Sequence, residues 1–151
     1  MAGDVSRLIL VKELLTHNPL GYIKYKLRAT FRKPDMDKIN YNLFIGGETS
    51  NVPDEFLIYN VRYLPEGKSF NVKLLEEVVY DVRRDIVSGK EVFVHCRHGR
   101  GRAPLIACAY MIKYADMSVA DALWYVREKR PNTCFSKEQI GLLEEFRSRC
   151  K

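Results

Sequence analysis

Hydrophobic and polar positions follow a regular pattern from Asn42 onward, and this pattern predicts strands that alternate with helices. Leu43 to Ile45 is a short apolar run that ends at two glycines, and Leu57 to Tyr63 is rich in β-branched and aromatic residues. Both segments are therefore predicted to be strands. A third run, Val92 to Val94, has the short, continuous apolar character of a buried parallel strand.

Apolar residues at helical spacing predict four helices in the same part of the chain. The first, Asn71 to Val87, is followed by Gly89, a residue that is common just past a helix end. Three successive helices are predicted at residues 103–114, 119–129 and 137–149. The middle one begins after the cap residue Ser118 and stops before Pro131. The fold class is therefore α/β, a central, mostly parallel sheet flanked by helices, with a helical C-terminal half.

The first 42 residues are less regular and form an atypical N-terminal segment. Val5 to Leu15 is predicted to be a helix with Asp4 as its cap. In Leu20 to Phe31, apolar residues recur at spacings of three and four, as on a helix, but from Ile23 to Phe31 they also alternate with polar residues, as in a half-buried strand. A helix is favoured because Asn18 and Pro19 supply a cap and a first turn.

Composition and length indicate one globular domain. The chain has 151 residues, of which 46% are hydrophobic and 29% are charged, and this excludes a mainly disordered or collagen-like protein. No apolar run is long enough for a membrane-spanning helix or a signal peptide, so we expect a cytoplasmic protein without a transmembrane segment. The four cysteines are neither dense enough for a disulfide scaffold nor spaced like zinc ligands, and they are interpreted as thiols.

The net charge of +6 is concentrated in one segment. Between His17 and Lys38 there are six cations and only two anions, with aromatic residues interleaved. Such a segment favours an anionic partner, such as a lipid surface, an inositol phosphate or RNA. The alternative is an ordinary solvated face.

The candidate chemistry lies where the third strand meets the following helix. Cys96 follows the strand directly, and five loop residues separate it from Arg102 at the helix start; this segment, residues 96–102, is called the cysteine loop below. Backbone N–H groups of such a loop can converge on a tetrahedral anion, and the helix N-terminus adds its positive dipole end. Gly99 and Gly101 suit sharp turns or close approaches of the backbone. Arg102 can hold two phosphate oxygens in a bidentate fork.

The same positive field acts on the sulfur. A helix terminus and nearby cations lower the pKa of a thiol from its ordinary value of about 8.5, so Cys96 is predicted to be a thiolate nucleophile. Arg97, His98 and Arg100 add further positive charge to the loop and favour a multiply charged anion. The alternative is that these three side chains act only on the thiol or pair with acidic neighbours.

His95-Cys96, Gly99 and Arg102 match the Cys-x5-Arg motif of the protein tyrosine phosphatase superfamily, and the short chain resembles its dual-specificity branch. The resemblance extends over residues 43–149 and includes the helices around Ser118 to Leu123 and Val126 to Pro131. It implies a single phosphatase domain over residues 1–151, with a core at 43–151 and a helical, basic extension at 1–42.

The resemblance also implies a two-step reaction without metal or cofactor. Cys96 attacks phosphorus to give a cysteinyl-phosphate while a general acid protonates the leaving oxygen, and water then hydrolyses the intermediate. The implied substrates are phosphotyrosine, phosphoserine or phosphothreonine in proteins. Phosphoinositides, inositol phosphates or RNA 5′ ends remain alternatives, as does a weakly active phosphate-binding module. A rhodanese-like sulfur or arsenate enzyme also uses a loop cysteine, but the loop length fits phosphate better.

The chain departs from the family pattern at three places. Glu66 stands where the general acid, an aspartate about thirty residues before the cysteine, is expected; Asp54 or no acid at all are the alternatives. Ala103 replaces a Ser or Thr whose hydroxyl stabilises the leaving thiolate, and this predicts a slow second step. The 20 positions from Gly46 to Glu66 are fewer than the family normally has.

A few further residues have predicted roles. Cys108, Tyr110 and Trp124 are expected to pack in the core. Gln139 is a candidate for orienting the hydrolytic water, with an ordinary helix-surface position as the alternative. A protective disulfide between Cys96 and another cysteine under oxidation is a further alternative, and the spacing does not select its partner.

Overall fold

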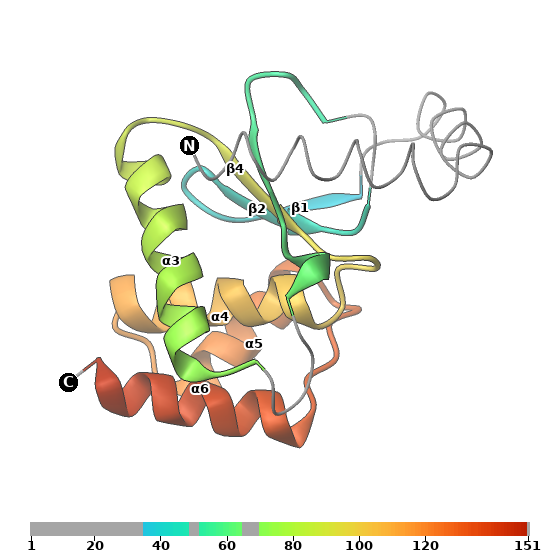
Figure 1. Ribbon diagram of the computed structural model, residues 1–151. Coiled ribbons are helices and arrows are strands. Elements are labelled where there is room, and N and C mark those ends of the chain that lie inside the picture. The colour runs from blue at the N-terminus through green and yellow to red at the C-terminus, as the bar shows by residue number, and fades with distance from the viewer. Residues whose placement is uncertain (1–34, 49–51, 65–69, 151) are drawn as a thin grey trace.

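The computed structural model describes residues 35–48, 52–64 and 70–150 (Figure 1). The helices predicted at Val5 to Leu15 and Leu20 to Phe31, most of the basic segment and Glu66 lie outside these residues. The described residues form a sheet of four strands, four α-helices and one 3₁₀-helix.

The sheet has the strand order β1-β2-β4-β3. Its strands are β1 (Met36–Asn40), β2 (Leu43–Gly46), β3 (Leu57–Asn60) and β4 (Val92–His95). β4 is parallel to both β2 and β3, whereas β1 is antiparallel to β2. The prediction of a mostly parallel central sheet flanked by helices is confirmed. Because Gly46 and Asn60 both pair with His95, the three parallel strands end side by side, at the edge where the cysteine loop begins.

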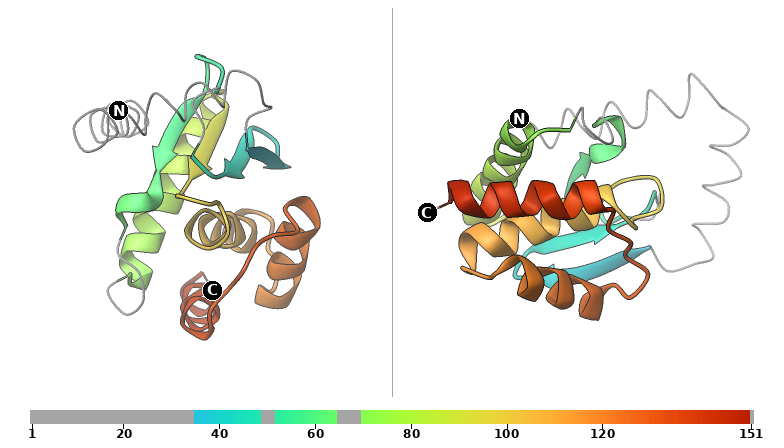
Figure 2. Two further views of the ribbon diagram at one scale, coloured as in Figure 1. Left: turned by 90° about the vertical axis from the view of Figure 1, so that its right-hand side faces the viewer. Right: turned by 90° about the horizontal axis from the view of Figure 1, so that it is seen from below.

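Alternation along the strands gives the sheet two apolar faces. Leu43, Ile45 and Val94 point to one face and are completely buried in the main core. Ile58 and Phe93 point to the other face and belong to a smaller cluster. All four described α-helices contribute to the main core, and Figure 2 shows them on that side of the sheet.

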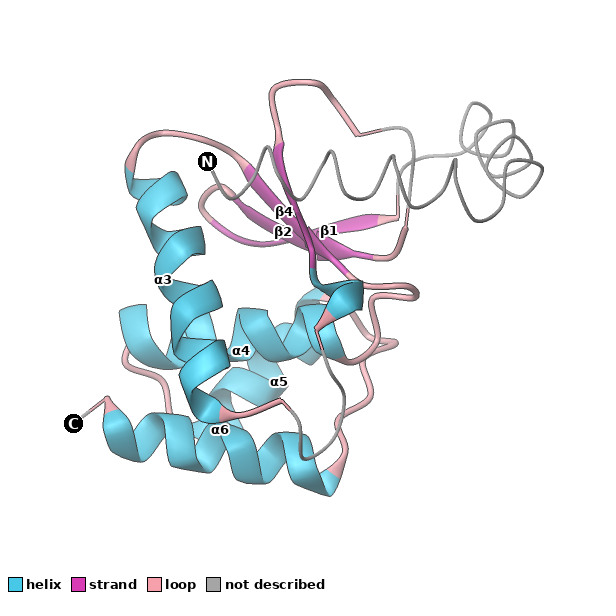
Figure 3. Cartoon of the chain, viewed as in Figure 1, coloured by secondary structure: helices cyan, strands magenta, loops and turns pink. Residues whose placement is uncertain are grey.

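The helices agree with the prediction to within one residue. They are α3 (Val72–Val87), α4 (Arg102–Tyr114), α5 (Val119–Lys129) and α6 (Lys137–Arg149), shown in Figure 3. The side chains of Asn71, Ser118 and Ser136 each accept a hydrogen bond from a backbone N–H in the first turn, which explains three of the starts. α4 is buried along most of its length and packs against α3, α5 and α6.

Two elements differ from the prediction. The strand predicted at Leu57 to Tyr63 ends at Asn60 and continues as a 3₁₀-helix, η1 (Val61–Tyr63). The reason is local, because the Asn60 side chain accepts a hydrogen bond from the Arg62 N–H at 3.1 Å and turns the chain. Strand β1 is absent from the prediction because, of its five residues, only Ile39 is buried, so the apolar pattern there is too weak.

The prediction that Trp124 packs in the core is wrong, because its side chain is 66% exposed. The buried residues of α5 are Val119, Ala122 and Val126. Trp124 lies on a different side of the helix from these positions. Tyr110 and Cys108 are buried in α4 as predicted, and burial raises the pKa of the Cys108 thiol to about 12.

Candidate active site

Cys96 lies at the carboxyl edge of the parallel sheet, directly after β4. Its backbone N–H donates to the carbonyl of Gly46 at 3.3 Å, so the cysteine loop leaves the sheet beside the end of β2. The Cys96 side chain is almost fully buried, with 4% of its surface exposed. The loop then leads into α4, whose first residue is Arg102. The strand, loop and helix order predicted from the sequence is therefore present.

The carbonyl groups of residues 96–101, the first six residues of the cysteine loop, all point outward. Each accepts a hydrogen bond from a group outside the loop or in the following turn of α4: Cys96 O from His95 Nδ1 (3.3 Å), Arg97 O from Glu48 N (3.1 Å), His98 O from Arg130 Nη2 (3.0 Å), Gly99 O from Arg130 Nε (2.7 Å), Arg100 O from Cys134 N (2.6 Å) and Gly101 O from Leu105 N (2.9 Å). In a planar trans peptide the next N–H points away from the carbonyl. The N–H groups of residues 97–102 therefore face the inside of the loop, where an anion would bind.

The sulfur takes part in this arrangement. The Gly99 N–H donates to Cys96 Sγ at 3.2 Å, a contact that stabilises negative charge on the sulfur. Gly99 has a φ of +67°, and a Cβ at this position would lie only 2.4 Å from the carbonyl carbon of Gly46. Only glycine fits this conformation and this close approach. The sequence had indicated the need for Gly99, but not its packing against Gly46.

His95 contacts the Cys96 carbonyl at the start of the loop and stacks on Phe93, with 5.4 Å between the ring centroids. The pKa of His95 is lowered to about 4, mainly by burial; the backbone contact with Cys96 partly opposes this shift, and the positive charge of Arg62 adds to it. The ring is therefore neutral at pH 7, and Nδ1 carries the hydrogen that it donates to the Cys96 carbonyl.

Arg102 extends from the start of α4 across the site to the end of η1. Its Nη1 donates to the backbone carbonyls of Arg62 and Leu64, the second at 3.2 Å. Arg62 is in turn held by an ion pair with Glu48 at 2.6 Å. The guanidinium thus lies between the loop and the segment that leads toward Glu66.

A pocket of about 530 Å³ opens above the loop. Cys96, Gly101 and Arg102 line it together with the cationic side chains of Arg97, His98 and Arg100. Its other walls are Phe70, Leu105, Leu142, Ser136, Glu138 and Gln139. The structure therefore brings most of the predicted substrate-binding residues together around the thiol. Gly99 and Ala103 are buried and do not line the pocket.

The structure describes only one of the two candidate acids, Asp54. Glu66 lies outside the described residues, but Leu64 before it contacts Arg102 and Phe70 after it lines the pocket. Asp54 precedes β3 at the amino edge of the parallel strands, where Leu57 N donates to Glu91 O at 2.9 Å. Cys96 lies at the opposite, carboxyl edge. The alternative that Asp54 is the acid is therefore not supported.

Gln139 lines the pocket, as its candidate role requires. Its Oε1 accepts from the Ser136 N–H at 2.9 Å in a capping box, which fixes the orientation of the amide. A Cβ at Gly101 would lie 3.4 Å from its Nε2, so the donor end of the amide faces the loop. Among the described residues, no group of three or more His, Cys, Asp or Glu side chains is placed to hold a metal ion.

Comparison with known proteins gives the family. Residues 28–149 match the family described as dual specificity phosphatase, catalytic domain. Together with the mixed sheet and the loop around Cys96, this places the protein among the cysteine-based phosphatases of the protein tyrosine phosphatase superfamily. Within that class, the chain belongs to the dual-specificity phosphatase catalytic domain family.

Two curated relatives differ in their described substrates. The phosphatidylglycerophosphate phosphatase PTPMT2 of Arabidopsis thaliana is 35% identical over 65 residues, which cover 43% of this chain and 28% of that protein. Dual specificity protein phosphatase 16 of Homo sapiens is 29% identical over 146 residues, which cover 95% of this chain and 19% of that protein. The chain thus spans less than a third of the length of either relative.

Solved structures share the fold. A mouse putative dual specificity phosphatase complexed with zinc tungstate has a TM-score of 0.69 at 18% identity, over 78% of this chain and 89% of that one. PTPMT1 in complex with PI(5)P has a TM-score of 0.65 at 19% identity, over 77% and 96%. In the part of the chain that the structure describes, no helix is long and apolar enough to cross a membrane.

Proposed function

We propose that this chain hydrolyses phosphate monoesters through a cysteinyl-phosphate on Cys96. The observation that carries the proposal is the orientation of the loop, in which the outward hydrogen bonds of the carbonyls turn the N–H groups of residues 97–102 toward the space above the sulfur. This arrangement supplies donors to the three non-bridging oxygens of a phosphoryl group. Arg102 adds a fixed positive charge at the same place.

The reaction has two displacements. In the first, the Cys96 sulfur attacks phosphorus, an S–P bond forms, and the bond from phosphorus to the leaving oxygen breaks. In the second, water attacks the same phosphorus, the S–P bond breaks, and the thiolate and inorganic phosphate are released. Ala103, which is fully buried at the start of α4, offers no hydroxyl to the departing thiolate. The second displacement is therefore the slow one in this proposal.

Glu66 is the proposed general acid. The described residues on either side of its segment both border the site, since Leu64 contacts Arg102 and Phe70 lines the pocket. A carboxylic acid there protonates the leaving oxygen in the first step and its carboxylate takes a proton from water in the second.

The first substrate class is phosphotyrosine, phosphoserine or phosphothreonine in proteins, as the family description suggests. A second class, phosphoinositides or related multiply charged phosphates, is favoured by the exposed Arg97, His98 and Arg100 beside the pocket and by its apolar wall. Relatives described as phosphatidylglycerophosphate phosphatases support the same class. Phosphate release from a phosphotyrosine peptide and from phosphoinositide vesicles, compared at equal enzyme concentration, distinguishes the two.

All four cysteines of the chain are free thiols. A thiolate mechanism requires a reduced Cys96, so a reducing compartment such as the cytoplasm suits the proposed activity.

Steady-state hydrolysis of para-nitrophenyl phosphate tests the proposed nucleophile and phosphate ligand. Cys96→Ser is expected to abolish turnover while the folded protein still binds tungstate, because the anion donors remain. Arg102→Lys is expected to lower kcat/KM about a hundredfold or more, because one ammonium cannot replace the bidentate fork. Cys150→Ser, at an exposed cysteine after α6, is the matched control and should leave the rate unchanged.

Turnover that survives in Cys96→Ser would contradict the proposal. A wild-type protein that binds tungstate but releases no product would instead favour a phosphate-binding module.

A further inference from the structure

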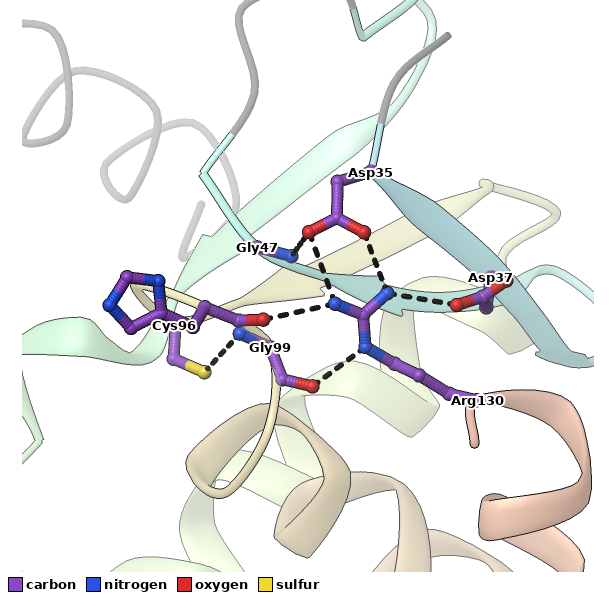
Figure 4. A network of polar contacts seen from close by, with 7 residues as sticks. Asp35, Asp37, Gly47, Cys96, Gly99 and Arg130 are labelled. Carbon is purple, nitrogen blue, oxygen red and sulfur yellow. Dashed lines mark hydrogen bonds and ion pairs between the residues drawn. The ribbon is translucent and has the colours of Figure 1, made fainter. Parts of the chain in front are cut away.

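Arg130 is a buried cation outside the loop that the reaction scheme does not use. It follows α5 as its C-cap residue, and only 2% of its surface is exposed. A guanidinium has five N–H donors, and each finds an acceptor here. Nε donates to Gly99 O (2.7 Å), Nη1 to Asp35 Oδ1 (2.8 Å) and Asp37 Oδ2 (2.8 Å), and Nη2 to Asp35 Oδ2 (3.1 Å) and His98 O (3.0 Å). Figure 4 shows this network.

The two aspartates make this burial possible. A buried charge without a partner is strongly unfavourable, because it loses its hydration. Burial alone would lower the pKa of Arg130, but the hydrogen bonds and negative charges of Asp35 and Asp37 outweigh it and raise the pKa above its ordinary value. The side chain is therefore a permanent cation held on one side by two carboxylates.

The other side of the guanidinium holds two consecutive peptide groups of the cysteine loop. Because each peptide is planar, fixing the carbonyl of His98 fixes the N–H of Gly99, and fixing the carbonyl of Gly99 fixes the N–H of Arg100. The Gly99 N–H donates to Cys96 Sγ at 3.2 Å on the opposite side of the peptide. Arg130 and the Cys96 sulfur thus contact opposite sides of the same peptide group.

Asp35 connects this side of the loop to the residues that follow β2. Asp35 also accepts from the Gly47 N–H at 3.2 Å, and the next residue, Glu48, donates its N–H to Arg97 O at 3.1 Å. A side chain at Gly99 would lie 2.5 Å from Arg130 Nη2. The guanidinium therefore lies between the start of β1 and the loop backbone and contacts both.

We propose that Arg130, held by Asp35 and Asp37, is a positioning residue that keeps the Gly99 and Arg100 N–H groups directed at the Cys96 sulfur and the bound phosphoryl group. This inference rests on the function proposed for the loop. It requires the planar fork of arginine, because a lysine ammonium cannot contact two neighbouring carbonyls and two carboxylates in one plane. Loss of the fork leaves both peptides able to rotate.

The test is the pH dependence of Cys96 alkylation by iodoacetamide, measured by mass spectrometry of the Cys96 peptide, together with kcat and KM for para-nitrophenyl phosphate. Arg130→Lys is expected to move the midpoint of the alkylation profile upward by about one pH unit or more, the equivalent of one charge-assisted hydrogen bond. kcat/KM is expected to fall about tenfold or more at neutral pH for the same reason. Arg127→Lys, the same change at an exposed position of α5, is the matched control and should alter neither.

Asp37→Asn keeps the test decisive if Arg130→Lys does not fold. Asp37 is partly exposed, with 39% of its side-chain surface accessible, and asparagine retains an acceptor oxygen. This variant should move the alkylation midpoint in the same direction by a smaller amount and lower kcat/KM to a smaller extent.

The proposal would be overturned if a folded Arg130→Lys variant had the same alkylation profile and kcat/KM as Arg127→Lys. If Arg130→Lys does not fold, the same result for a folded Asp37→Asn variant would overturn it. Alkylation does not depend on turnover. A shifted profile in a protein that hydrolyses no phosphate ester would support the positioning role and contradict the proposed phosphatase activity.

Discussion

His95 is a buried ring whose pKa differs between the folded and unfolded protein. Only 1% of its surface is exposed, and its Nε2 has no hydrogen-bond partner among the described residues. Burial lowers its pKa to about 4, from an ordinary value of 6.5. The folded state therefore binds this proton more weakly than the unfolded chain does.

This difference predicts a loss of stability in mild acid. Because the folded pKa is depressed, the contribution of His95 to the free energy of unfolding is fully present above pH 6.5 and is lost as the pH falls toward 4. Between pH 7.5 and 5 the free energy of unfolding should fall by about 2 kcal/mol from this residue. Urea denaturation of the wild type and of His95→Gln measures it. An equal loss in both proteins would show that His95 is not the source.

Residues of the cysteine loop could be predicted because their spacing is local. Cys96, Gly99 and Arg102 lie within seven positions, and the chemistry of an anion-binding turn requires these residue types in this order. Arg130 could not be found this way. It is one of 25 Lys and Arg residues, and its contacts with Asp35 and Gly99 join distant parts of the chain.

At the scale of elements, helices were predicted more accurately than strands. α3, α5 and α6 have polar caps and apolar positions at helical spacing, and both signals are local. β1 depends instead on pairing with β2, and it contributes only Ile39 to the core. The end of β3 is set by a side-chain hydrogen bond of Asn60, which competes with the strand pattern.

The segment between η1 and α3 carries the proposed general acid. Glu66→Gln removes the transferable proton, so hydrolysis of a phosphate ester with a poor leaving group, such as phenyl phosphate, should slow about a hundredfold or more. An ester with a good leaving group should be affected much less, because its oxygen leaves without protonation. The ratio of kcat/KM for the two esters is the measurement. Asp54→Asn, at the opposite edge of the sheet, is the control and should leave this ratio unchanged.

An equal loss on both esters in Glu66→Gln would exclude Glu66 as the acid. A changed ratio in Asp54→Asn would restore that residue as a candidate.

At the scale of the whole molecule, the site depends on segments that are far apart in sequence. The cysteine loop is held by the end of β2, by Arg130 after α5 and by Cys134 before α6. Asp35 and Asp37, at the beginning of the described chain, complete the arrangement. Removal of the residues around β1 would therefore affect the loop, although β1 itself contributes little to the core.

The central claim is that phosphate passes through a covalent intermediate on Cys96. Its most direct test is rapid acid quenching during turnover of para-nitrophenyl phosphate, followed by mass spectrometry of the intact protein and its peptides. We predict one phosphoryl group on Cys96, abundant in the wild type because Ala103 slows hydrolysis, and less abundant in Ala103→Ser, where a hydroxyl stabilises the leaving thiolate. A phosphoryl group on another residue, or turnover with no phosphorylated protein in either form, would contradict the account.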